Sequence, residues 1–187
     1  MKKSIGSVFI LAAAVMSAPA GGDPAQAASV FQPPALITSA GQSADVQLAS
    51  VLAKRAEVEA TLGKMASAAD LEKHKTLILV LGASMKGLGA AGLDTNKEKD
   101  RIAGLLAEAA KRGIPVLCLH LGGEARRGDL TDEMVAAYLP SARSAIVVKS
   151  GNKDGLFTKI CREKNIPLVE VEKTLDAVAP LRAAFGK

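Results

Sequence analysis

The stretch HLGGEARRGDLTDE, residues 120–133, gathers a histidine, a glutamate and two arginines around a glycine pair. It continues the apolar run IPVLCLHL, residues 114–121, which is typical of a buried strand. Arginine binds carboxylate and phosphate groups through two parallel hydrogen bonds, and glycine lets a backbone approach a ligand closely. The stretch therefore predicts an anion-binding loop in which Arg126 attracts the anion and Glu124 orients an arginine.

Three further loops carry residues of similar chemistry. They are SAGQSAD (39–45), GASMKGLGAAGLD (82–94) and KSGNKDG (149–155), and each follows an apolar run. Free N–H groups at helix N-termini and positive charge together favour a small anion such as a carboxylate, sulfate or phosphate. The predicted ligand-binding residues are Ser39, Gln42, Ser43, Ser84, Lys86, His120, Glu124, Arg126, Lys149, Ser150 and Asn152.

Structural roles are the alternative for several of these residues. Ser150 and Asn152 have the side chains that cap helix N-termini. Arg126 can pair with Glu124 or Asp129, and the loop glycines can serve tight turns. A histidine at a strand end, as His120 is, can equally be a hydrogen-bonded structural residue.

Catalysis is the second alternative, and the sequence assigns no catalytic residue. An enzyme, hydrolase or transferase, could use Ser84 with Lys86, or Cys118 with His120. The segment GLGAAG, residues 87–92, matches a dinucleotide-binding pattern in letters, but it starts six residues after the strand instead of at its turn. We therefore predict no cofactor, and too few ligands surround Cys118 and His120 to predict a metal site.

The elements that must position these loops alternate along the chain. Apolar runs predict five strands, at 35–39, 76–81, 114–121, 144–149 and 167–171. Helical spacing predicts five helices, at 45–62, 95–111, 131–140, 155–164 and 173–185. Thr95 and Glu98 form a capping box, Thr131 is a cap, and Pro180 is expected to kink or split the last helix. Such alternation builds a parallel sheet with helices on both faces. We predict an α/β fold, a three-layer, doubly wound, five-stranded sheet of flavodoxin-like order 2-1-3-4-5. Its switch point, where ligands bind, would lie between strands 35–39 and 114–121.

The first residues predict export. Lys2 and Lys3 precede an apolar run, and Ala25-Gln26-Ala27 forms a small-x-small cleavage site. We predict a signal peptide at 1–27, an extended leader at 28–34 and one α/β domain at 35–187. The protein would then be periplasmic or extracellular, with no stable membrane span after cleavage.

Composition limits the partners. The formal net charge is +5, tryptophan is absent, and basic residues alternate with acids. Single-strand binding proteins need aromatic stacking surfaces, so nucleic acid is not predicted. Cys118 and Cys161 are predicted to be small buried residues, with a disulfide between them as the alternative.

Four segments together resemble an exported bacterial α/β domain family of unknown function. They are ITSAGQS (37–43), LILVLGASMKGLGAAGLD (77–94), PVLCLHLGGEARRG (115–128) and VVKSGNKDG (147–155). The resemblance covers nearly the whole chain after residue 27. It implies one exported α/β domain and brings no activity, ligand or catalytic residue.

The sequence thus favours an exported, non-enzymatic domain that binds a small anionic molecule. A small-molecule hydrolase or transferase is one alternative. The other is a structural envelope protein that binds a protein partner, with glycines that serve only turns.

Overall fold

A computed structural model describes residues 31–187 of the chain. The predicted signal peptide, 1–27, and residues 28–30 of the predicted leader lie outside the described residues. The rest of the leader packs against the domain: the Phe31 ring is buried 6.0 Å from that of Phe185, and Gln32 exchanges hydrogen bonds with Thr76.

Six parallel strands form one sheet in the order β2-β1-β3-β4-β5-β6. Their bounds are β1 Ala35–Ala40, β2 Ala60–Leu62, β3 Thr76–Leu81, β4 Val116–His120, β5 Ser144–Val148 and β6 Leu168–Val171. Every residue of β1, β3 and β4 is buried, as continuous apolar runs predict for a sheet covered on both faces.

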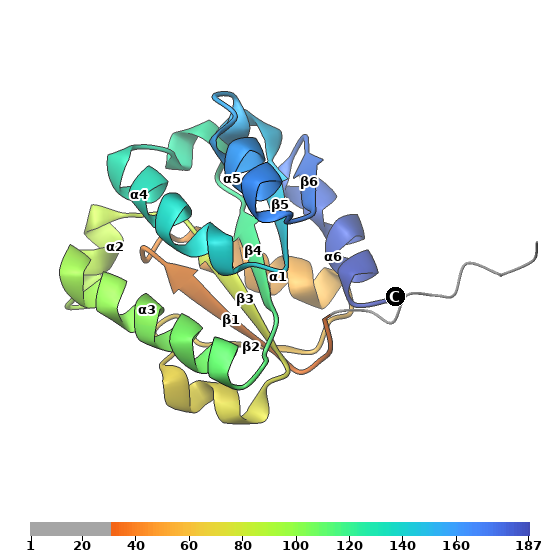
Figure 1. Cartoon of the computed structure of the whole chain (residues 1–187), viewed down its shortest axis with the longest axis horizontal. Coiled ribbons are helices and arrows are strands. Elements are labelled where there is room, and N and C mark those ends of the chain that lie inside the picture. Colours follow the sequence, from red (N-terminus) through yellow and green to blue (C-terminus); the bar gives the residue numbers. More distant parts are fainter. Residues whose placement is uncertain (1–30) are drawn as a thin grey trace, which may run out of the picture.

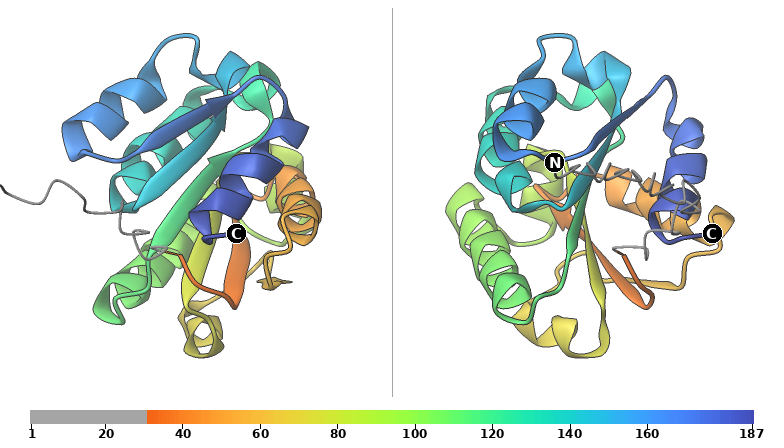
Figure 2. Two further views of the ribbon diagram at one scale, coloured as in Figure 1. Left: turned by 90° about the vertical axis from the view of Figure 1, so that its right-hand side faces the viewer. Right: turned by 45° about the vertical axis from the view of Figure 1, so that its right-hand side comes forward.

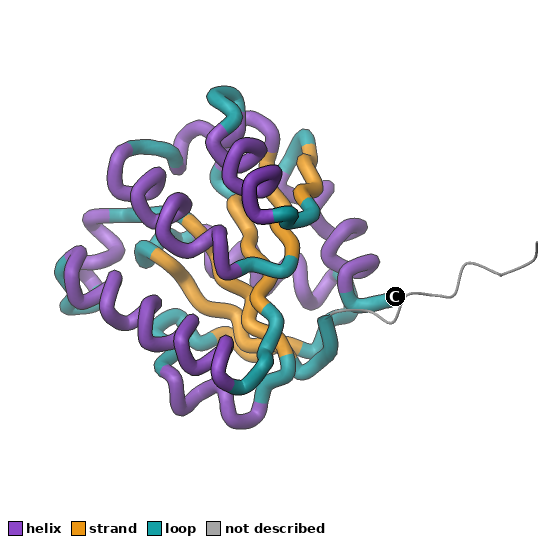
Figure 3. Tube along the Cα trace, viewed as in Figure 1, coloured by secondary structure: helices purple, strands orange, loops and turns teal. Residues whose placement is uncertain are grey.

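Helices cover both faces of the sheet (Figures 1 and 2). Their bounds are α1 Asp45–Arg55, α2 Met85–Ala90, α3 Thr95–Lys111, α4 Asp129–Tyr138, α5 Leu156–Lys164 and α6 Val178–Ala184. One apolar cluster joins the sheet to α3, α4 and α5, and the other joins it to α1 and α6. Strands form the middle layer between these helices (Figure 3), so the predicted three-layer α/β fold is observed.

The predicted helix 45–62 is wrong beyond Arg55. Glu57 adopts a left-handed backbone conformation, with a φ of 60°. The N–H groups of Glu57 and Val58 donate back to the carbonyls of Lys54 and Ala53, which is a Schellman ending. Glycine normally occupies this position, so a glutamate there hid the end of the helix.

The structure has one strand more than the predicted five, β2, and this moves the switch point from its predicted place. The flavodoxin-like order is kept in its six-stranded form, but β1 pairs with β2 and β3. The predicted pairing of strand 35–39 with strand 114–121 is therefore wrong, since β3 lies between them. The order reverses between β1 and β3.

Other local predictions differ in detail. The glycine-rich loop 82–94 contains α2, and Asp94, not Thr95, caps α3 by accepting from the Lys97 N–H at 2.8 Å. The Thr131 hydroxyl accepts from Ala83 N–H instead of capping α4. The last predicted helix splits into a 3₁₀ turn and α6 at residue 178, just before Pro180.

Within residues 31–187, no helix is long and apolar enough to cross a bilayer. Cys118 and Cys161 are both buried and form no disulfide.

Candidate functional site

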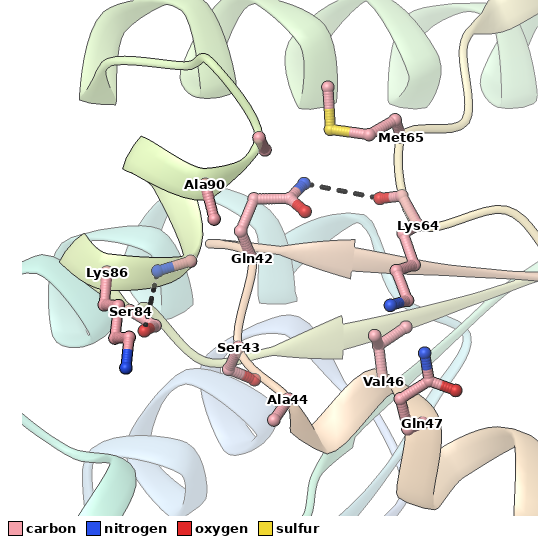
Figure 4. A pocket seen from close by; sticks show the side chains of 12 residues that line it. Gln42, Ser43, Ala44, Val46, Gln47, Lys64, Met65, Ser84, Lys86 and Ala90 are labelled. Atoms are coloured by element: carbon pink, nitrogen blue, oxygen red, sulfur yellow. Dashed lines mark hydrogen bonds between the residues drawn. The ribbon is translucent and has the colours of Figure 1, made fainter.

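The carboxyl ends of the parallel strands place the candidate loops along one edge of the sheet. A groove with a volume of about 520 Å³ opens there beside β1 and β3 (Figure 4). It lies at the switch point, where doubly wound sheets bind ligands. The groove is lined by Gln42, Ser43, Ala44, Val46, Gln47, Lys64, Met65, Ser84, Lys86, Gly87, Ala90 and Ala91.

Four of the predicted ligand-binding residues meet in this groove: Gln42, Ser43, Ser84 and Lys86. Gln42 has a positive φ of 57° and forms an isolated bridge with Ala83. This brings the loop after β1 against the start of α2. A Cβ at Gly87 would lie 1.9 Å from the Gln42 carbonyl oxygen, so glycine is required for that approach.

A buried ion pair supports the groove from behind. The fully buried Glu98 carboxylate accepts from the Gly41 N–H at 2.8 Å and from Arg101 Nε and Nη2, each at 2.9 Å. Arg101 also donates to the carbonyls of Ser39 and Ala66, at 2.6 and 2.7 Å. The Glu98–Arg101 pair therefore links α3 to the loops that follow β1 and β2. Both charged groups have hydrogen-bond partners within the fold, as a buried ion pair requires.

The charge of the groove is positive. Its lining residues include Lys64 and Lys86 and neither aspartate nor glutamate. The two lysines lie on opposite sides of Ser43 (Figure 4). Neither ammonium group has a hydrogen bond or ion pair with any residue that the structure describes. Five of the other lining residues, Ala44, Val46, Met65, Ala90 and Ala91, are apolar.

The serines of the groove differ in their hydrogen bonding. The Ser84 hydroxyl caps α2 by accepting from the Gly87 N–H at 3.1 Å. The buried Ser43 hydroxyl lies at the start of α1, where it accepts from the Asp45 N–H at 3.3 Å. The N-cap of α1 is Ala44, which provides no side-chain cap.

The loops after β4 and β5 are joined by Arg127, which has only 13% of its side chain exposed. Its guanidinium donates to Asp132, to both carboxylate oxygens of Asp154 and to the Gly151 carbonyl. It also lies over the Phe157 ring, 5.7 Å from the centroid. The hydrogen bonds from Arg127 lower the pKa of Asp154 to about 2. The contacts of Arg127 are therefore those of a structural residue that joins these two loops.

His120 is enclosed beneath these loops. Its Nδ1 lies 3.0 Å from the Leu81 carbonyl oxygen, and its Nε2 lies 3.1 Å from that of Gly123. Burial lowers its pKa, although both carbonyls act in the opposite direction. A neutral imidazole has only one N–H and can donate to only one of them. The ring stacks on Phe157 at 5.0 Å and does not line the groove.

Asn152 is also engaged within the fold. Its side-chain oxygen accepts from the Phe157 N–H at 2.9 Å at the start of α5. Its amide donates to Thr158 and Glu170. Asn152 therefore has the helix-capping role that the sequence offered as the alternative to ligand binding.

The remaining predicted residues lie outside the groove. Glu124 pairs with Lys153, and Lys149 pairs with Glu172 at 2.8 Å, both on the exposed surface. Ser150 is exposed after β5. Ser39 is buried in β1, and its hydroxyl has no hydrogen-bond partner among the described residues. Arg126 lies 3.2 Å from Asp45, so Asp45, and not Glu124, orients it.

The two predicted catalytic pairs have different surroundings. Cys118 is buried, and desolvation raises the pKa of its thiol, which opposes formation of a thiolate nucleophile. Ser84 and Lys86 lie in the same groove. Within the described residues, no group of three or more histidine, cysteine, aspartate or glutamate side chains could hold a metal ion.

Sequence reasoning missed Lys64, Met65, Asp45, Glu98 and Arg101. Lys64 and Met65 follow β2, so recognising that short strand would have placed them at the same sheet edge. Asp45 and Glu98 were each assigned to the first turn of a helix, where acids are common. No local pattern showed that their carboxylates turn inward.

Comparisons with known proteins give a family and distant similarities. The chain is similar in structure to a G-D-S-L family protein, described as lipolytic, from Desulfitobacterium hafniense DCB-2, with 15% identity, a TM-score of 0.37, and coverage of 73% of this chain and 75% of that one. It is also similar to AlinE4, an SGNH-hydrolase family esterase, with 15% identity, a TM-score of 0.30, and coverage of 78% and 77%. TM-scores this low say nothing about activity. No curated protein matches the sequence.

The family model for the domain of unknown function DUF6305 matches residues 32–185, which is almost all of the described chain. The predicted membership of a family of unknown function is confirmed. The chain belongs to the DUF6305 family.

Proposed function

We propose that this protein binds a small organic anion in the groove between β1 and β3. The observation that carries the proposal is the lining of the groove, which has two lysines and no acid. Both lysines are exposed at the groove, and positive charge without a counter-ion there attracts an anionic ligand, which supplies the missing partner.

The apolar lining narrows the ligand class. Ala44, Val46, Met65, Ala90 and Ala91 contact whatever fills the groove, so a ligand with a carbon skeleton gains more than an inorganic ion does. The Ser43 hydroxyl, between the two lysines, provides a hydrogen-bonding group. A carboxylate on a short apolar chain matches this combination.

Calorimetric titration of the purified protein tests the proposal. The probes are butyrate and benzoate, with butyramide as the uncharged control. We expect the acids to bind, butyramide not to bind, and added salt to weaken binding. Lys64→Ala and Lys86→Ala should each weaken butyrate binding about tenfold, which corresponds to about 1.4 kcal/mol.

Lys149→Ala is the matched control, because Lys149 lies on the same sheet edge but pairs with Glu172. It should leave binding unchanged. An equal loss in Lys149→Ala, or equal binding of butyramide, would contradict a site in the groove.

A hydrolase is the second candidate, since Ser84 and Lys86 share the groove. The hydrogen bond from the Gly87 N–H to the Ser84 hydroxyl supports a capping role instead. Turnover of p-nitrophenyl butyrate that disappears in Ser84→Ala, while folding is kept, would favour the hydrolase.

The proposed place of binding is outside the cytoplasm, and this rests only on the predicted signal peptide. Mass spectrometry of the protein from whole cells and from the extracellular fraction tests it. Loss of residues 1–27 from the exported form is the expected result.

A further inference from the structure

The Arg126 side chain packs directly against two glycines, Gly82 and Gly122. A Cβ at Gly82, just after β3, would lie 2.8 Å from Arg126 Cγ, and a Cβ at Gly122, just after β4, would lie 2.6 Å from Arg126 Cβ. Both distances are shorter than real side chains allow. The arginine can lie across the ends of these two strands only because both positions are glycine.

Asp45 fixes the direction of this arginine. Its side chain is only 6% exposed, and Oδ2 lies 3.2 Å from Arg126 Nε. The geometry is that of an ion pair without an aligned hydrogen bond, and both atoms are buried. The two terminal nitrogens of Arg126 have no partner among the described residues. They form the planar fork that binds a carboxylate through two hydrogen bonds.

Ser43 lies between Arg126 and the groove. Its hydroxyl oxygen lies 3.2 Å from the position where a Gly82 Cβ would be, and Arg126 Cγ lies 2.8 Å from the same position. The two side chains therefore meet over one glycine, while Ser43 also lines the groove between Lys64 and Lys86. A ligand that reaches Ser43 in the groove therefore comes close to the Arg126 side chain, although Arg126 does not itself line the groove.

We propose that Arg126 binds a second anionic group of the ligand, so that the protein selects dicarboxylates with a short apolar spacer. This proposal rests on the proposed function of the groove. One lysine of the groove binds one carboxylate, the apolar residues contact the spacer, and the Arg126 fork binds the other carboxylate. Arg126 is a binding residue, and Asp45 is a positioning residue that acts through it.

The test compares succinate, glutarate and adipate with butyrate by calorimetric titration of the full chain. At least one dicarboxylate should bind about tenfold or more tightly than butyrate, since each additional tenfold needs only about 1.4 kcal/mol. Arg126→Gln should abolish this preference, with the affinity for dicarboxylates falling about tenfold more than the affinity for butyrate. Lys86→Ala should weaken both classes.

Two further variants separate binding from folding. Arg126→Lys keeps the charge but loses the fork, so it should recover only part of the preference. The double variant Asp45→Asn/Arg126→Gln removes both charges together and leaves no unpaired buried carboxylate. It should unfold at a midpoint close to that of the wild-type protein and lose the preference for dicarboxylates.

The outcomes distinguish the two proposals. Equal affinity of the wild-type protein for butyrate and all three dicarboxylates would overturn the role of Arg126 but keep the groove. An equal loss of both ligand classes in Arg126→Gln would also overturn it. No binding of any carboxylate to the wild-type protein would overturn the proposed function itself.

Discussion

The cations along the carboxyl edge of the sheet have different surroundings in its two halves. After β4 and β5, Arg127 is surrounded by Asp132, Asp154 and a backbone carbonyl, all within the fold. After β2 and β3, Lys64 and Lys86 line a groove whose lining contains no acid. Both halves looked alike as sequence, with glycines, hydroxyl groups and positive charge. The position of the acids decides which half keeps cations without a counter-ion.

Removing the buried carboxylate behind the groove should have the largest effect. Glu98→Ala leaves Arg101 buried without its counter-ion, so we expect the free energy of unfolding to fall by about 3–5 kcal/mol. Urea denaturation measures this loss. Glu133→Ala, which removes an exposed partner of Lys99, should cost far less. Similar losses in the two variants would show that the groove has no buried electrostatic support.

Disrupting the half after β4 and β5, which we call the closed half, should have the next largest effect. Arg127→Gln removes the hydrogen bonds to Asp132 and Asp154, and we expect a loss of about 2 kcal/mol, in the range of charge-assisted hydrogen bonds. Arg182→Gln is the matched control and should cost far less, because that arginine is 41% exposed and pairs with Glu57 on the surface. Butyrate binding should be unchanged in Arg127→Gln. A weakened affinity there would mean that the two halves are not independent.

His120 should give the closed half a pH dependence. Its pKa in the fold is lowered by burial and by the charge of Arg127, against the raising effects of two carbonyls and Asp45. The unfolded chain therefore binds more protons near pH 6, so stability is present above the ordinary histidine pKa of about 6.5 and is lost as pH falls below it. His120→Gln should flatten this slope. Unfolding free energies at about pH 8, 7, 6 and 5 measure the slope in both proteins, and identical slopes would contradict the prediction.

Asp154 should give the smallest effect. Its pKa is lowered to about 2 by Arg127, so its contribution is present above its ordinary pKa of 3.8 and is lost as pH falls through about 2. The side chain is 56% exposed, and solvent screening keeps the contribution below about 1 kcal/mol. Asp154→Asn should flatten acid unfolding over this range, as followed by circular dichroism. A larger change would place Asp154 among the main supports of the closed half.

The strands were predictable where the sequence has an apolar run. The runs at β1, β3, β4 and β5 are apolar along almost their whole length, because both of their faces are covered by helices. Strand β2 has three residues and none of them is buried, so it leaves no comparable pattern. That one strand determines where the sheet order reverses, and missing it moved the predicted switch point by one strand.

The candidate site was predictable in its residue types but not in its pairing. Four residues of the groove were identified from the loops, since each follows a strand. Ion pairs such as Lys153–Glu124 and Arg126–Asp45 join loops distant in sequence. Only the folded chain shows which cations are already neutralised.

The short strand β2 also affects how molecules meet each other. Exposed strand edges are templates for pairing with other chains, and short edge strands limit this hazard. Beyond the three residues of β2, the edge of β1 is covered by the chain itself: Gly63 N–H donates to the Ile37 carbonyl, and the Thr38 hydroxyl donates to the Lys64 carbonyl. The same loop that provides Lys64 to the groove thus protects the sheet from edge-to-edge aggregation.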